Sequence, residues 1–148
     1  MSQVKAIPDG YHSVQPYVML KNCAEAIGFY SKAFGAKEKF RMPDAQGRIQ
    51  HAEIQIGDSI VMMADEAPQM NAYSVEHFGG SPVSLLIYTE DCDEMYSQAL
   101  GAGAKSLREP ADQSYGDRMS GVQDPFGYKW WIATHIKDMS PAEMAAQQ

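Results

Sequence analysis

Hydrophobic and polar positions follow a pattern that occurs twice along the chain. Residues 22–37 read NCAEAIGFYSKAFGAK and residues 91–105 read DCDEMYSQALGAGAK, and in both segments apolar side chains recur with the 3.6-residue period of a helix. Each segment opens with an Asn or Asp followed three residues later by glutamate, and each ends in Gly-Ala-Lys. These features are typical of helix beginnings and ends. The pattern predicts two amphipathic helices, with Met95, Ala99 and Leu100 on the buried face of the second.

A short run of apolar or alternating residues precedes each predicted helix, and three more runs follow it. Such runs, bounded by Gly, Pro, Asn and Asp, indicate strands. They lie at residues 15–20, 37–42, 48–57, 59–64, 84–89, 105–110, 118–123 and 128–134. Each half of the chain is therefore predicted to contain a strand, a helix and three strands. The fold class is α+β, with two tandem β-α-β-β-β modules.

The repeat also gives the boundaries of the parts. We expect one domain in which an exposed linker or lid, rich in Gly, Pro and Asn, joins the two modules. Ser140 as N-cap, with Glu143 three residues later, favours a helix at the end of the chain. Within residues 1–148, module one is expected at about 11–66, the linker at about 67–82, module two at about 83–138 and the terminal helix at about 140–147.

The composition narrows the range of partners. At 148 residues and 45% hydrophobic content, the chain can bury one ordinary core. Its 19 acidic against 12 basic residues give a net charge of −7, which repels nucleic-acid phosphates and anionic membranes, so neither is an expected partner. The two cysteines are too few for a disulfide framework. Because no run approaches the ~18 apolar residues of a membrane span, we expect a cytoplasmic protein.

Several short motifs accompany the repeated unit between Tyr11 and Met144. They are FY at 29–30, YGDR at 115–118, DPFG at 124–127, Trp131, ATH at 133–135 and SPAEM at 140–144. Together with the repeat, they resemble the vicinal oxygen chelate superfamily, which includes glyoxalase I, extradiol dioxygenases, fosfomycin-modifying enzymes and bleomycin-resistance proteins. More narrowly, they are similar to its PhnB-like branch. The resemblance implies modules whose curved mixed sheets enclose a cavity, with the helices on the convex side, and a homodimer.

Metal-dependent members of that superfamily place one ligand on the first strand and one on the last strand of each module. By this resemblance the four positions fall on Gln15, on Met62 (or Met63 after a shift of one residue), on Ser84 and on Trp131. Glutamine matches glyoxalase I, but a thioether is a poor ligand for a hard divalent ion. Serine and tryptophan stand where the family has histidine and glutamate. We therefore expect no cofactor and none of the usual metal centre.

A second set of polar residues leaves another possibility open. His51 and Glu53 are two residues apart on a predicted strand, so their side chains point to the same face. Together with Gln15 they could hold a divalent metal at an atypical site, or act as a catalytic base and its orienting group. The plainer interpretation is a hydrogen-bonded pair lining a wet cleft. The opposite face of the strand, from residue 52 to 56, is apolar and suits packing under a helix.

The remaining candidates would bind a ligand through aromatic and polar groups. Tyr17 and Tyr88 are assigned to equivalent positions on the first strands of the two modules. Alternation places one residue of the Trp130 and Trp131 pair under a helix and the other toward the cavity. The side chains predicted to bind ligand are Gln15, Tyr17, Met62, Ser84, Tyr88, Arg118 and Trp131.

Two interpretations are left open for Arg118: it binds an anionic group, or it pairs with a nearby carboxylate while Asp117 closes the turn before it. The function predicted from the sequence is the binding of a small organic molecule without the usual metal. The alternative is a metal-dependent glyoxalase-like lyase or isomerase, or a dioxygenase, acting through Gln15, His51 and Glu53.

Overall fold

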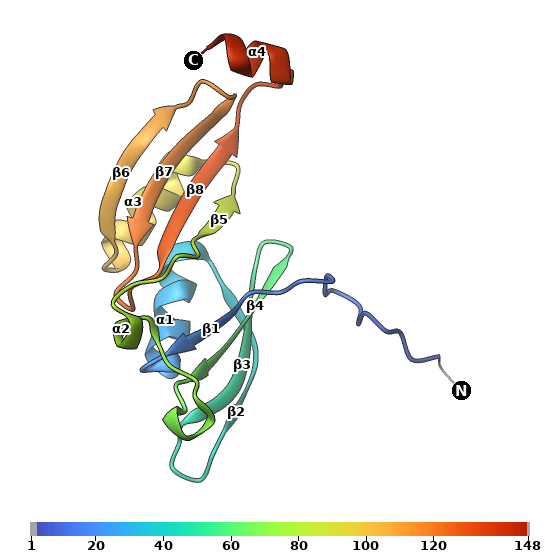
Figure 1. Ribbon diagram of the computed structural model, residues 1–148, viewed down its shortest axis with the longest axis vertical. Coiled ribbons are helices and arrows are strands. Elements are labelled where there is room, and N and C mark those ends of the chain that lie inside the picture. Colours follow the sequence, from blue (N-terminus) through green and yellow to red (C-terminus); the bar gives the residue numbers. More distant parts are fainter. Residues whose placement is uncertain (1–2, 148) are drawn as a thin grey trace. The chain divides into compact units, whose positions relative to one another are not determined.

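The computed structural model describes residues 3–147, and the chain divides after Phe78 into two compact units (Figure 1). This division falls inside the segment that the sequence predicts as a linker. Each unit contains one four-stranded sheet in which the first strand runs parallel to the last and the other neighbours are antiparallel. The helix that follows the first strand makes the crossover that a parallel pair requires.

The first unit has the strand order β1-β4-β3-β2. Its elements are β1 (Tyr17–Leu20), α1 (Cys23–Phe34), β2 (Lys37–Pro43), β3 (Ile49–Ile56), β4 (Ser59–Asp65), the 3-10 turn η1 (Pro68–Met70) and α2 (Val75–Phe78). The second unit has the order β5-β8-β7-β6. Its elements are β5 (Leu85–Tyr88), α3 (Cys92–Ala102), β6 (Lys105–Asp112), β7 (Asp117–Gln123), β8 (Lys129–His135) and α4 (Pro141–Ala146). The α+β class and the terminal helix predicted from the sequence are confirmed.

The helix boundaries are set by side chains identified in the sequence. Asn22 and Asp91 accept a hydrogen bond from the backbone N–H three residues later, at 3.2 and 3.0 Å. Gly35 and Gly103 end α1 and α3 in the left-handed conformation, which costs glycine little. The buried face of α3 differs from the prediction, because Tyr96 is buried and donates to the Ser106 hydroxyl at 2.6 Å.

Helices α1 and α3 are each hydrogen-bonded to the last strand of their own sheet. The N–H of Cys23, the first residue of α1, donates to Asp65 Oδ1 at 2.8 Å, and the N–H of Cys92, at the same place in α3, donates to Thr134 Oγ1 at 2.8 Å. These N–H groups have no partner inside the helix, so a side chain from the sheet satisfies them. The other carboxylate oxygen of Asp65 accepts from the N–H of Ile49, at the start of β3, at 2.7 Å.

These contacts determine which face of each sheet is covered by the helix. Because Asp65 points toward α1, the alternating residues Met63 and Val61 share its face, and their register partners Ala52 and Ile54 do so as well. All four are buried, as the apolar alternation of residues 52–56 predicts. We call the opposite side, which carries His51 and Glu53, the open face of the first sheet.

The segment predicted as an exposed linker is only partly exposed. Its N-terminal part forms η1, where the backbone of Ala67 bridges to that of Ala72. Ser74 and Val75 are buried, and the N–H and hydroxyl of Ser74 both donate to Glu66 Oε2, at 3.0 and 2.8 Å. The segment is therefore anchored to the end of β4. None of the helices between residues 3 and 147 is long and apolar enough to cross a membrane.

The DPFG turn and the first tryptophan form one hydrogen-bonded unit. Asp124 Oδ1 accepts from the N–H groups of Phe126 and Tyr128, both at 2.9 Å, while Oδ2 accepts from the indole N–H of Trp130 at 2.8 Å. Trp130 is only 1% exposed. One carboxylate therefore closes the turn and satisfies a buried indole.

We expect Asp124→Ala to lower the free energy of unfolding by about 3 kcal/mol, because it removes the turn bonds and leaves a buried N–H without its acceptor. Asp44→Ala is the matched control. Asp44 Oδ1 accepts from Gln46 and Arg48 with the same spacing, but no indole binds it. Urea unfolding monitored by circular dichroism measures both variants. Equal losses would contradict the role assigned to the Trp130 bond.

Candidate functional site

The open face of the first sheet carries a continuous row of side chains. The strand register places Tyr17 of β1 beside Met62 of β4, Met62 beside Glu53 of β3, and Glu53 beside Phe40 of β2. Glu53 is only 5% exposed, whereas Tyr17 is 50% exposed. A buried carboxylate therefore lies at the centre of the row, with an accessible phenol at the β1 end.

A chain of hydrogen bonds connects these groups. The Tyr17 hydroxyl lies 2.7 Å from His51 Nδ1, and His51 Nε2 lies 2.8 Å from Glu53 Oε2. The hydroxyl of Tyr11, from the segment before β1, donates to Glu53 Oε1. The structure thus brings together the predicted residues Tyr17, His51 and Glu53, and it adds Tyr11.

The ionisation of Glu53 determines the direction of these bonds. Burial acts to raise the pKa of Glu53, but the hydrogen bonds from His51 and Tyr11 outweigh it, so the pKa lies below its ordinary value. An ionised carboxylate only accepts hydrogen bonds, so His51 Nε2 carries the proton. In the neutral imidazole Nδ1 is then an acceptor, and the Tyr17 hydroxyl donates to it. Burial raises the pKa of Tyr17, which keeps the phenol protonated at rest.

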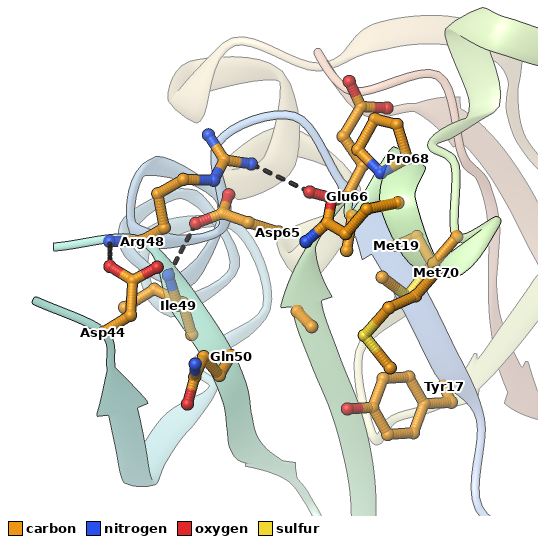
Figure 2. A pocket seen from close by; sticks show the side chains of 14 residues that line it. Tyr17, Met19, Asp44, Arg48, Ile49, Gln50, Asp65, Glu66, Pro68 and Met70 are labelled. Atoms are coloured by element: carbon orange, nitrogen blue, oxygen red, sulfur yellow. Dashed lines mark hydrogen bonds between the residues drawn. The ribbon is translucent and has the colours of Figure 1, made fainter. Parts of the chain in front are cut away.

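A cavity of about 790 Å³ adjoins this hydrogen-bonded chain in the first unit. Figure 2 shows Tyr17, Met19 and Met70 on one side and Arg48 and Asp65 on the other. The segment after β4 contributes one side of the cavity. The lining residues are Tyr17, Met19, Asp44, Arg48, Ile49, Gln50, Ala64, Asp65, Glu66, Ala67, Pro68, Gln69, Met70 and Ala72.

The charged side chains around the cavity are mostly acidic, and some of their carboxylate oxygens already accept hydrogen bonds from other groups of the protein. Asp65 accepts from two backbone N–H groups, and Glu66 accepts from Ser74. Arg48 Nη2 donates to the backbone carbonyl of Glu66 at 3.0 Å (Figure 2). Because the cavity is lined by three carboxylates, those of Asp44, Asp65 and Glu66, and by one guanidinium, its wall disfavours anions.

In the second unit, Trp131 lies on the face away from α3 and spans neighbouring strands. Cys92 of α3 lies 3.5 Å from the hydroxyl of Ser120, so the residues that alternate with Ser120 point to the opposite face. Trp131 pairs with one of these, Gly121, and its indole N–H donates to Ser84 Oγ at 3.0 Å. The indole is therefore bound by a residue of the same unit. Ser84 and Trp131, both predicted to bind ligand, lie in contact.

A second polar cluster lies on the same face. Asp117, which is buried, accepts from the Tyr88 hydroxyl at 2.8 Å and lies 2.8 Å from His135 Nδ1. The other ring nitrogen of His135 lies 2.7 Å from Asp138 Oδ1. Hydrogen bonds to Asp117 and Asp138 raise the pKa of His135. This cluster connects β5, β7 and β8 to the segment before α4.

Arg118 lies on the side of the sheet that faces α3, and both of its neighbours there are carboxylates. Its guanidinium donates to Asp93 of α3 at 2.6 and 2.9 Å and to Asp112 at 3.0 Å. Of the two interpretations that the sequence leaves open, the structure shows the ion pair. Asp117 also closes the turn between β6 and β7, because its backbone carbonyl accepts from the Gln113 N–H at 2.7 Å, and β7 begins at Asp117, one residue before the predicted start.

The two tyrosines do not occupy equivalent positions. Tyr17 pairs with Met62, and Leu86 pairs with Trp131. Met62 and Trp131 are the equivalent positions on the last strands of the two modules. Their partners on the first strands, Tyr17 and Leu86, are therefore equivalent to each other. Tyr88 lies two residues further along β5, on the same face, and its hydroxyl binds a carboxylate instead of a histidine.

The positions that the resemblance assigns to a metal carry unsuitable groups here. Gln15 Oε1 accepts from the His12 N–H at 2.5 Å, and Ser84 Oγ accepts from the indole of Trp131. Met62 offers a soft thioether, and the indole N–H is only a donor. Among residues 3–147, no group of three or more His, Cys, Asp or Glu side chains is placed to hold a metal ion. The donor set does not fit the usual divalent centre.

Sequence reasoning missed Tyr11, Asp138 and the role of Asp117. The bond from Tyr11 to Glu53 joins residues 42 positions apart, so no local pattern reveals it. Asp138 lies beyond the last strand. The partnership of Asp117 with Tyr88 follows from alternation only once the start of β7 is known.

Comparison with known proteins agrees with this fold. The model of the Glyoxalase/Bleomycin resistance protein/Dioxygenase superfamily matches residues 12–132, and the chain belongs to this superfamily. The uncharacterized protein Rv0887c of Mycobacterium tuberculosis is 34% identical over 137 residues, covering 90% of this chain and 81% of that protein. A similar protein of Mycobacterium bovis, Mb0911c, is also 34% identical over 137 residues, covering 90% of each chain.

Two solved structures illustrate the shared fold. TioX from Micromonospora sp. ML1 has a TM-score of 0.66 at 25% identity, covering 87% of this chain and 100% of TioX. A PhnB protein from Bacillus cereus, described as a putative 3-demethylubiquinone-9 3-methyltransferase, has a TM-score of 0.63 at 14% identity, covering 83% of this chain and 99% of that one. The latter likeness concerns the fold alone.

We expect Gly121→Ala to displace the indole of Trp131, because a Cβ at this glycine would lie 2.3 Å from the ring. The clash should lower the free energy of unfolding by about 1–3 kcal/mol and change the tryptophan fluorescence. Gly101→Ala in α3 is the control, since its Cβ would meet nothing within 4 Å. An unchanged emission spectrum in Gly121→Ala would contradict this placement of Trp131.

His135 should stabilise the protein more in acid than in base. Because its folded pKa is raised, its contribution is fully present below about pH 6.5, the ordinary value, and is lost as the pH rises through the folded pKa. Urea unfolding of wild type and His135→Ala should therefore differ more at about pH 5.5 than at about pH 9. A difference that does not depend on pH would contradict the charged pairing with Asp117 and Asp138.

Proposed function

We propose that the protein binds a small organic molecule in the cavity of its first unit, without the divalent metal of the metal-dependent superfamily members. The main support for this proposal is the cavity itself, whose volume of about 790 Å³ falls in the range of small-molecule sites. Tyr17, Met19 and Met70 give it an apolar side. Thioethers are flexible and polarisable, so such a wall accommodates ligands of different shapes.

The metal-independent part of the proposal is supported by the chemistry of the ligand positions. A hard divalent ion needs oxygen or imidazole donors with free lone pairs. Met62 and Trp131 supply neither, and the oxygens of Gln15 and Ser84 already accept hydrogen bonds from the protein. Binding therefore depends on apolar contact and hydrogen bonding.

The charges around the cavity suggest the kind of ligand. Three carboxylates and one guanidinium border it, and the whole chain carries a net charge of −7. An anionic molecule would lose solvation and meet a negative potential. Neutral or cationic aromatic compounds are the proposed ligand class.

A thermal-shift screen with neutral, cationic and anionic aromatic compounds tests this proposal. We expect neutral or cationic compounds to raise the melting temperature, as binding to the folded state requires. Met19→Ala should weaken that binding about 10-fold, or ~1.4 kcal/mol, because contact with a lining side chain is lost.

Met119→Ala is the matched control, since Met119 is a half-buried methionine of the second unit, outside the lining of the cavity. Equal weakening by both variants would contradict binding in this cavity. So would a screen in which only anions stabilise the protein.

The second candidate is the metal-dependent lyase, isomerase or dioxygenase acting through Gln15, His51 and Glu53. The short His51–Glu53 contact favours it. However, both nitrogens of His51 and both carboxylate oxygens of Glu53 already have protein partners, which a metal would have to displace. Metal analysis of protein purified without an affinity tag separates the candidates. A stoichiometric metal that His51→Ala removes would favour the enzyme.

A further inference from the structure

We propose that Tyr17, His51 and Glu53 form a proton-transfer triad in which the Tyr17 hydroxyl acts on the molecule bound in the adjoining cavity. The inference rests on the proposed function for its substrate, but the triad can be tested without that substrate. It assigns an activity to the site, general acid–base catalysis on a weakly acidic group such as a C–H next to a carbonyl or a phenolic O–H.

The first support is the order of the groups. A hydroxyl, an imidazole and a buried carboxylate are joined in series at 2.7 and 2.8 Å. The carboxylate fixes the imidazole tautomer, so that the nitrogen facing Tyr17 is free to take a proton. This is the arrangement by which a weakly acidic hydroxyl becomes reactive, because its proton leaves as the new bond forms.

The second support is the position of the hydroxyl. Tyr17 is half exposed and lines the cavity, whereas Glu53 is buried. The phenol of Tyr17 is therefore accessible at the wall of the cavity, and the group that stabilises the charged imidazole is shielded from water. Tyr11 occupies the other oxygen of Glu53, which holds the carboxylate in place.

All proton transfers take place between the triad and the bound molecule. The Tyr17 proton moves to His51 Nδ1, and the phenolate oxygen takes a proton from the acidic group of the bound molecule. The result is a neutral Tyr17, a ligand anion and an imidazolium paired with Glu53. Reversal of these transfers returns the proton to the same or a neighbouring atom of the ligand. No oxidant, reductant or metal takes part.

The test uses benzenesulfonyl fluoride, a probe that reacts with activated phenols. Tyr17 Oη attacks sulfur, the S–F bond breaks, fluoride leaves, and the phenolic proton passes to His51. Peptide mass mapping over time measures the rate at each tyrosine. Tyr88 is the internal control, because it is more exposed, at 64% against 50%, but binds a carboxylate instead of an imidazole. We expect Tyr17 to react faster than Tyr88.

His51→Ala should slow labelling of Tyr17 by about 100-fold, the usual scale of a lost general base. His135→Ala, a histidine of the second unit, should leave the Tyr17 rate unchanged. Circular dichroism and the melting temperature show whether each variant is folded. Equal rates at Tyr17 and Tyr88, or an unchanged Tyr17 rate in folded His51→Ala, would overturn the proposal.

Glu53 is the positioning residue of the triad, and its role has a separate readout. Nitrogen chemical shifts of the His51 ring should show the proton on Nε2 in the wild type, and Glu53→Gln should alter this tautomer balance and slow labelling. A resting Nδ1–H tautomer would overturn the assignment. Because labelling needs no cavity ligand, failure of the triad leaves the thermal-shift result intact, and failure of that screen leaves the labelling result intact.

Discussion

The bond between the first N–H of α1 or α3 and the last strand of its own sheet determines how the rest of each unit is arranged. Asp65 and Thr134 reach toward the helix, and strict alternation then directs their neighbours Ala64 and Ala133 to the other face. The helix side becomes core, and the opposite side becomes available for polar chemistry. Tyr17, His51 and Glu53 can gather there because that side is not needed for helix packing.

The two units use this same architecture for different chemistry. In the first, a buried glutamate holds a histidine against Tyr17, and a cavity adjoins them. In the second, a buried aspartate joins Tyr88 and His135, and an indole fills the place next to Gly121. The repeat is therefore preserved in its backbone and has diverged in the side chains of its open faces.

The sequence was sufficient for the features that depend on local periodicity. Helix caps, the succession of strand, helix and three strands along each repeat, and the opposite placement of Trp130 and Trp131 all follow from spacing and alternation. Alternation also predicted that His51 and Glu53 lie on the same face. The sequence did not predict contacts between distant segments: the bond of Tyr11 to Glu53, for example, depends on where the chain before β1 lies. The predicted buried face of α3 was correct at Ala99 but omitted Tyr96, whose hydroxyl binds a partner on β6.

The way in which Trp131 is held bears on recognition by the second unit. Its ring lies over Gly121, and its N–H is bound to Ser84, so its rotamer is already selected in the free protein. The conformational entropy of a large side chain is thus lost during folding and not during association. A flat molecule that stacked on this indole would meet a preorganised surface.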